Sequence, residues 1–187
     1  MVILCRKPLS ELYQSGNGTL GSGTRNAFSE VNPSSRSIAY PMYGAGTITD
    51  IVEKEVLGEI HKYYDVNLPH SKMTVLIPVE SSARVGVRRI ITAEDFPAVF
   101  KLLGEEAEAM PANWNRRYRL NMDRLKTGEI EEVASVVRNL VRSDRKKSLS
   151  TGEKKLLGTA KQILESELML AGNYTMEEAD ELVESHI

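Results

Sequence analysis

Apolar and polar positions follow three different patterns along the chain. Residues 1–35 are rich in Gly, Ser, Asn and Thr and show no sustained apolar period. Residues 36–90 hold short apolar runs separated by prolines and glycines, whereas from residue 92 apolar positions recur at the i, i+3, i+4 spacing of a helix. The pattern predicts an α+β chain: a flexible N-terminal extension (1–35), a β domain (36–90) and a helical domain (92–187).

The β domain is predicted to form a small barrel or a strongly bent sheet. Its runs are spaced by about ten residues, which is typical of short strands joined by tight turns. The predicted strands cover residues 37–40, 47–52, 61–68 and 73–77, with turns at 42–46, 57–59 and 69–72.

About five helices are predicted for the helical domain. Capping boxes, in which a Ser or Thr precedes an acidic residue by three positions, occur at 92–95, 150–153 and 175–178. Gly128 suits the left-handed position that ends the second helix, and Gly172 is predicted to end the fourth. Glu167 is the polar exception on the apolar stripe of the fourth helix.

Local charge differs strongly from the overall balance. The 187 residues carry 24 Lys+Arg and 26 Asp+Glu, and this net charge of −2 argues against a protein that coats nucleic acid through bulk positive charge. Residues 114–161 nevertheless hold 13 basic and 6 acidic side chains, while residues 162–187 hold 7 acids and no Lys or Arg. Residues 36–110 hold 8 basic and 11 acidic side chains, so they suit a protein partner, for example by strand addition at a sheet edge, better than DNA.

The basic stretch is either a solvated helical face or a DNA-binding surface. Arg116 and Arg119 lie three residues apart on one face of the second helix, and arginine suits phosphate oxygens. Helix N-termini also attract phosphate, and the predicted helices that begin at Trp114 and Ser150 place two such ends within this stretch. The candidate DNA-contacting residues are Trp114, Arg116, Arg117, Arg119, Lys154 and Lys155.

Trp114 has two interpretations of its own. With Tyr118, Met122 and Leu125 it forms an apolar stripe at helical spacing, which is typical of a core position. It could equally be an aromatic wedge or stacking platform on DNA. The residues alone favour neither interpretation.

Other classes of function find little support in the residues. The chain has one cysteine, Cys5, and three scattered histidines, so we expect no disulfide and no metal site. Residues 16–21 match G-x-G-x-x-G but lack the preceding strand and following helix of a dinucleotide site, and no nucleophile elbow, P-loop or HExxH motif occurs. We therefore expect a non-enzymatic protein without cofactor or small-molecule substrate. The absence of a signal-peptide core or membrane-spanning run predicts a cytoplasmic protein.

Six segments, taken together and in order, resemble the CarD family of bacterial transcription regulators. They begin with a Tyr-Pro-x-x-Gly-x-Gly run and include Trp-x-Arg-Arg-Tyr and Leu-Ser-x-Gly-Glu-Lys. The segments are residues 40–46, 73–79, 85–88, 113–118, 132–140 and 149–157. The resemblance covers about residues 37–172.

The resemblance implies a Tudor-like (SH3-like) small β-barrel domain that binds the β subunit of RNA polymerase. It also implies a helical domain that touches promoter DNA, largely without reading sequence, at the upstream edge of the melted region. Trp114 matches the family's wedge tryptophan, and the basic contacts match Arg116, Arg119 and the Lys154–Lys155 helix start. The implied polymerase contacts are Tyr43, Lys54, Leu76 and Pro78. Leu76 stands where members carry a basic residue, and residues 33–37 replace the usual Phe-x-x-Gly-Asp opening.

The predicted function is therefore a regulator that binds polymerase and promoter DNA and stabilises open promoter complexes. The alternatives are an adaptor that binds protein only, and a nucleotide-binding enzyme that uses residues 16–21.

Overall fold

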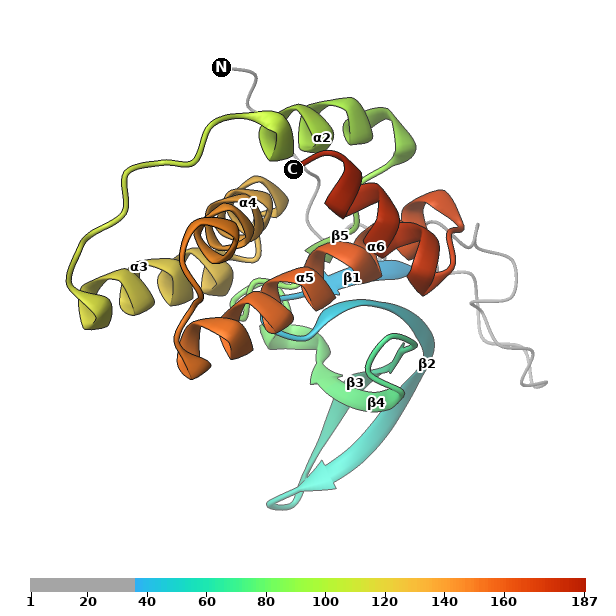
Figure 1. Cartoon of the computed structure of the whole chain (residues 1–187). Helices are drawn as coiled ribbons and strands as arrows, with labels where there is room; N and C mark the ends of the chain where they lie inside the picture. The colour runs from blue at the N-terminus through green and yellow to red at the C-terminus, as the bar shows by residue number, and fades with distance from the viewer. Residues whose placement is uncertain (1–35) are drawn as a thin grey trace.

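The computed structural model of the protein describes residues 36–187. The predicted extension (1–35) and the glycine-rich motif at residues 16–21 lie outside the described residues. The chain folds as predicted into an α+β structure, with a sheet in its first part and helices after it (Figure 1). Within the described residues, no helix has the length and apolar character needed to cross a membrane.

The sheet has five antiparallel strands in the order β4-β3-β2-β1-β5. The strands are β1 (Ser37–Tyr40), β2 (Gly44–Val56), β3 (Glu59–Leu68), β4 (Met73–Pro78) and β5 (Arg88–Arg89). β2 is longer than predicted because it begins within the glycine-containing turn and continues to the next hairpin. β4 and β5 are the edge strands, so each leaves one row of backbone groups unpaired within the sheet.

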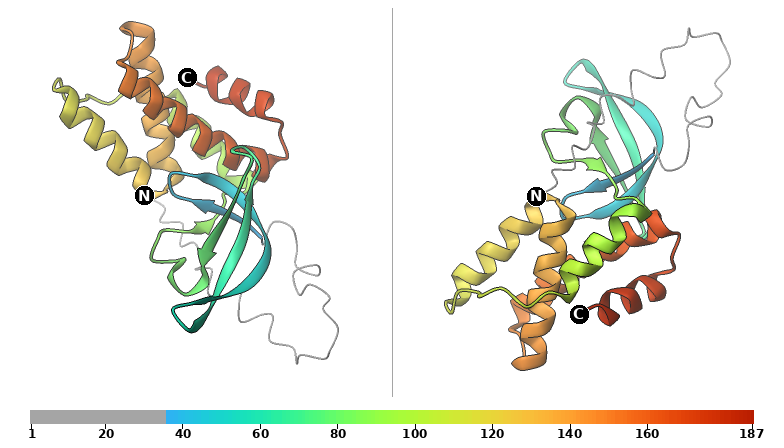
Figure 2. Two further views of the ribbon diagram at one scale, coloured as in Figure 1. Left: turned by 90° about the horizontal axis from the view of Figure 1, so that it is seen from below. Right: turned by 90° about the horizontal axis from the view of Figure 1, so that it is seen from above.

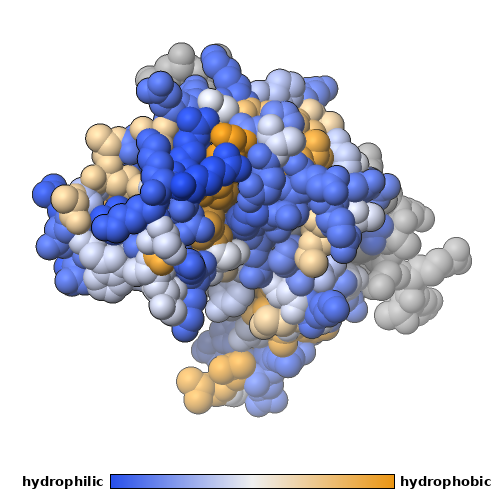
Figure 3. All heavy atoms as spheres, viewed as in Figure 1, coloured by the Kyte–Doolittle hydropathy of each residue, from blue (hydrophilic) through white to orange (hydrophobic). Residues whose placement is uncertain are grey.

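The β2–β3 hairpin projects away from the helices (Figure 1). Leu57 and Gly58 form its turn with positive φ angles of 56° and 84°, which match the twist of the two strands. Apolar side chains gather at its far end (Figure 3), where Val56, Leu57 and Ile60 are exposed.

Five α-helices follow the sheet among the described residues. They are α2 (Phe96–Gly104), α3 (Trp114–Thr127), α4 (Ile130–Lys146), α5 (Thr151–Gly172) and α6 (Met176–Ser185). The three predicted capping boxes are present. Gly128 ends α3 with φ 72° as predicted. The predicted end of α5 was wrong by one residue, because Gly172 is still helical and Asn173 takes the left-handed conformation.

α5 lies between the sheet and the other helices (Figure 2). The Ser166 hydroxyl accepts a hydrogen bond from the Ala45 N–H at 2.8 Å, which ties α5 to the start of β2. Glu167, the polar exception on the α5 stripe, is fully buried and pairs with Arg88 of β5 at 2.6 Å. One helix therefore serves both the helical core and the sheet.

Candidate functional site

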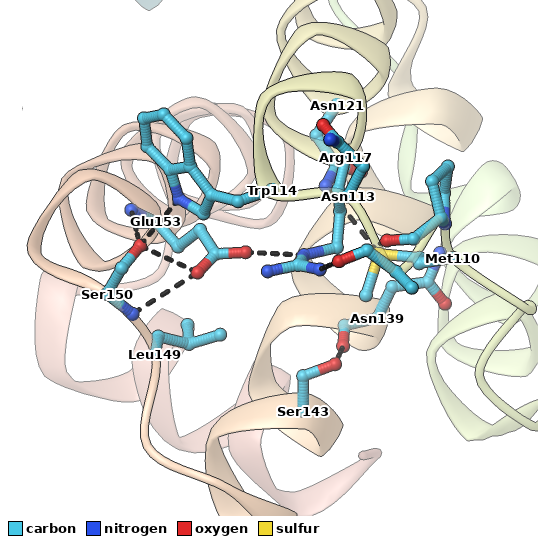
Figure 4. Close-up of polar contacts among 12 residues, drawn as sticks. Met110, Asn113, Trp114, Arg117, Asn121, Asn139, Ser143, Leu149, Ser150 and Glu153 are labelled. Atoms are coloured by element: carbon cyan, nitrogen blue, oxygen red, sulfur yellow. Dashed lines mark hydrogen bonds and ion pairs between the residues drawn. The ribbon is translucent and has the colours of Figure 1, made fainter.

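The N-terminal ends of α3 and α5 lie side by side. Asn113 caps α3 by accepting the Arg116 N–H at 3.0 Å, and Ser150 caps α5. Two contacts join the helix ends: the Trp114 indole N–H donates to the Ser150 hydroxyl at 2.9 Å, and Arg117 Nε donates to Glu153 at 2.6 Å (Figure 4). Because each helix start carries partial positive charge, their proximity creates a surface that favours anions.

Trp114 lies at the surface, outside the helical core. The predicted apolar stripe holds for the rest of α3, since Leu125 is buried and Tyr118 and Met122 pack against the core. Trp114 itself is 44% exposed and stacks on Tyr118, with ring centroids 5.7 Å apart. The core interpretation is therefore wrong for this residue, which presents part of a large aromatic ring to solvent beside two helix starts.

Local contacts sort the 13 basic residues of the 114–161 stretch into two groups. Seven are bonded to acidic side chains or, for Arg142, to a backbone carbonyl: Arg117, Arg124, Lys126, Arg138, Arg142, Arg145 and Lys161. Six are exposed and form no ion pair with any residue in the range 36–187: Arg116, Arg119, Lys146, Lys147, Lys154 and Lys155. Four members of the second group, Arg116, Arg119, Lys154 and Lys155, lie in the first two turns of α3 and α5 and were predicted from the sequence, while Lys146 and Lys147 lie at the end of α4, just before α5.

Arg117 is placed differently from its two neighbouring arginines. It is half-buried, bonded to Glu153 through Nε and to the Pro111 carbonyl at 3.0 Å. Burial alone would raise the pKa of Glu153, but the hydrogen bonds from Arg117 and Ser150 outweigh it and lower that pKa below its ordinary value. Glu153 thus stays ionised, and Arg117 is engaged within the protein, while Arg116 and Arg119 are exposed to solvent.

Three of the predicted polymerase contacts share the outer face of the sheet. Pairing of β3 with its neighbours aligns His61 with Lys54, Asp65 with Leu76, and Tyr63 with Pro78. These β3 residues alternate with Tyr64 and Val66, which face the sheet core. Leu76 and Pro78 also belong to the edge strand β4, so this face adjoins an open edge.

Tyr43 lies apart from those three residues. It sits in the turn before β2, stacks on Tyr40 at 4.9 Å between centroids and is 44% exposed. Its carbonyl faces the side chain of Gln162 on α5. Tyr43 is thus at the junction of the sheet with α5, not on the outer face with Lys54.

Two features of the site were absent from the candidates named from the sequence. Lys146 and Lys147 lie within the basic stretch but were not among the candidate DNA contacts, because the sequence gives no signal for which cations remain unpaired. The exposed apolar hairpin tip was interpreted only as a turn. Within residues 36–187 no group of three or more His, Cys, Asp or Glu side chains could hold a metal ion.

Comparison with known proteins finds two family models on this chain. The model described as "CarD-like/TRCF RID domain" matches residues 37–91, and that described as "CarD, C-terminal domain" matches residues 98–184. A curated protein of Bacillus subtilis (strain 168), named "Putative transcription factor YdeB", is 40% identical over 134 residues. That alignment covers 71% of this chain and 86% of the Bacillus protein.

Proposed function

The chain belongs to the CarD family and is a transcription-associated factor, and we propose that it binds the β subunit of RNA polymerase and promoter DNA together. In this proposal it acts without catalysis and stabilises open promoter complexes. The sheet contacts polymerase, and the paired starts of α3 and α5 contact DNA at the upstream edge of the melted region.

The observation that carries the DNA contact is the environment of Trp114. A partly exposed indole sits where two helix N-termini meet, and the first two turns of these helices and the end of α4 carry six exposed cations that form no ion pair with a described acid. Phosphates suit the cations and helix ends, while an aromatic ring suits an unstacked base step. These contacts fix position without reading sequence, so the six exposed cations are the proposed phosphate contacts: Arg116, Arg119, Lys146, Lys147, Lys154 and Lys155.

The outer sheet face supports the protein contact. Lys54, Leu76 and Pro78 lie on it beside the unpaired edge of β4, where a strand of a partner could add to the sheet. The negative balance of residues 36–110 disfavours DNA on this side. Tyr43 lies near the α5 junction, so we assign it to a separate edge of the contact.

Stabilisation of open complexes follows from differential binding. A wedge that fits a melted junction and not an intact duplex lowers the free energy of the open state alone. Anchoring on polymerase raises the local concentration of the wedge at that junction.

The test is the lifetime of open promoter complexes formed with purified polymerase and full-length protein. Trp114→Ala should shorten the lifetime while polymerase binding is retained, and Leu76→Asp should weaken polymerase binding. Leu120→Ala is the matched control, because Leu120 is also an exposed apolar residue of α3. An unchanged lifetime for Trp114→Ala contradicts the wedge. Absence of DNA binding even at low salt favours an adaptor that binds protein only.

A further inference from the structure

We propose that Ser150 is a positioning residue for Trp114, holding the indole through its N–H so that the ring meets DNA without a hydrogen bond to any base. This inference rests on the proposed function, because it concerns how the wedge tryptophan works. It adds an assignment for Ser150, Glu153 and Arg117 as the support that orients the ring.

The hydrogen bonds around Ser150 have one consistent arrangement. The Ser150 hydroxyl donates to Glu153 Oε2 at 2.7 Å, because an ionised carboxylate can only accept. Its lone pairs are then left to accept the Trp114 Nε1–H at 2.9 Å and the Glu153 backbone N–H at 3.4 Å. The acceptor side of the hydroxyl is therefore turned toward the indole.

Ser150, Glu153 and Arg117 form a closed network of hydrogen bonds around the indole (Figure 4). Glu153 accepts from Arg117 Nε at 2.6 Å, and Arg117 Nη1 donates to the Pro111 and Ala112 carbonyls at 3.0 and 3.3 Å. Those carbonyls lie just before Trp114 in the chain. These hydrogen bonds thus run from the indole to Ser150 and Glu153 of α5, and through Arg117 back to the start of α3. They therefore fix the indole relative to both helices.

Packing against Tyr118 and the first turn of α5 also restricts the position of the indole. One side of the ring stacks on Tyr118, and a side chain on Gly152 would place its Cβ 3.3 Å from Trp114 Cζ2. Gly152 therefore lets the indole lie close to the first turn of α5. With its single N–H donated to Ser150, the indole has only apolar ring surface to offer an incoming nucleic acid.

A double-mutant cycle between Ser150→Gly and Trp114→Phe tests the assignment. Glycine keeps much of the N-cap preference of serine, so Ser150→Gly removes the acceptor with little loss of helix stability. We expect it to weaken binding to a forked promoter DNA about fivefold, the factor supplied by one ordinary hydrogen bond. In the Trp114→Phe background, where the N–H is gone, Ser150→Gly should have no further effect. Ser150→Thr, which keeps the hydroxyl, should bind like the parent protein.

Fluorescence tests the support without DNA, since Trp114 is the single tryptophan of the chain. Ser150→Gly should lower the anisotropy of Trp114 emission and increase its quenching by acrylamide, whereas Ser150→Thr should leave both at their parent values. Unchanged anisotropy and quenching in Ser150→Gly overturn the positioning role.

The double-mutant cycle can also contradict the positioning role of Ser150. If Ser150→Gly weakens fork binding by the same factor in the parent protein and in the Trp114→Phe variant, the two side chains act independently, and the positioning role is overturned. If Trp114→Ala leaves fork binding unchanged while the fluorescence effects of Ser150→Gly are seen, the proposed DNA contact fails and the positioning of the indole stands.

Discussion

Arg88 and Glu167 form a buried, two-bond ion pair that joins the sheet to α5. The two terminal guanidinium nitrogens of Arg88, Nη1 and Nη2, lie 2.6 and 3.0 Å from the two carboxylate oxygens of Glu167. Arg88 Nε also donates to the Gly128 carbonyl at 2.8 Å, and Glu167 accepts the Ile91 N–H at 2.8 Å. The pair therefore connects β5, the end of α3, the start of the helical part and α5.

Replacing Glu167 should destabilise the whole protein, because it removes the carboxylate that is hydrogen-bonded to the buried Arg88 charge. We expect Glu167→Gln to lower the free energy of unfolding by about 3–5 kcal/mol. Glu53→Gln is the control, since its pair with Lys62 is exposed and such pairs contribute about 0–1 kcal/mol. Urea unfolding monitored by circular dichroism measures both. A loss of less than about 1 kcal/mol for Glu167→Gln contradicts the assignment.

The contact between Gly44 and Ser166 gives a second test of the sheet–α5 junction. Gly44 and Gly58 have similar φ angles, +90° and +84°, so alanine is strained at both positions. A Cβ at Gly44 would collide with the Ser166 hydroxyl, whereas a Cβ at Gly58 would meet no atom within 4 Å. Gly44→Ala should therefore cost about 1–3 kcal/mol more than Gly58→Ala in thermal or urea unfolding. Equal losses would show that the junction is loosely packed.

The three arginines at the start of α3 should separate into two functional kinds. Arg116→Ala and Arg119→Ala should each weaken DNA binding and reduce the slope of log K against log[salt] by about 1, with stability unchanged. Arg117→Ala should instead lower the free energy of unfolding, because it leaves Glu153 half-satisfied beneath the helix start. Salt titration of fork DNA binding and urea unfolding, run on all three variants, make the distinction. If Arg117→Ala leaves the free energy of unfolding unchanged and reduces the slope of log K against log[salt], Arg117 is a DNA contact like Arg116 and Arg119.

Sequence patterns predicted the features that depend on near neighbours. The Ser150–Glu153 capping box, the left-handed Gly128 and the hairpin turn at residues 57–59 all involve contacts within three residues, so short motifs specify them. Partners distant in sequence were not predictable in this way. Glu167 lies 79 residues from Arg88, so it was seen only as an exception to a stripe.

The candidate site shows the same division. Trp114, Arg116 and Arg119 were proposed as DNA contacts because their types and spacing suit DNA, and their exposure agrees with that proposal, whereas the engagement of Arg117 depends on a carboxylate 36 residues away. The two interpretations of Trp114 likewise could not be separated until its exposure was known, because that exposure depends on how α3 packs against residues distant in sequence.

Glu165 should make stability depend on pH near neutrality. Burial raises the pKa of Glu165 to about 7. Lys161, 4.0 Å away, opposes this rise, but Lys161 is held more closely by Asp180 and Glu184, whose carboxylates raise the pKa of Glu165 further. His70 on the β3–β4 turn lies 3.6 Å from Glu165, but burial lowers the pKa of His70 and so disfavours the imidazolium that would stabilise the Glu165 carboxylate.

The folded state therefore holds a proton on Glu165 that the unfolded chain has already released. The contribution of Glu165 to the free energy of unfolding should be fully present below the ordinary glutamate pKa of about 4.5. It should be lost as pH rises from there through about 7. Glu165→Gln removes the titration and should raise the free energy of unfolding by about 1–3 kcal/mol at about pH 8, with little change at about pH 5. The control is Glu181→Gln, an exposed α6 residue that forms no ion pair with the described part of the chain. Urea unfolding across this pH range gives the comparison, and a Glu165→Gln gain that is the same at both pH values would show that ionisation of Glu165 does not oppose folding.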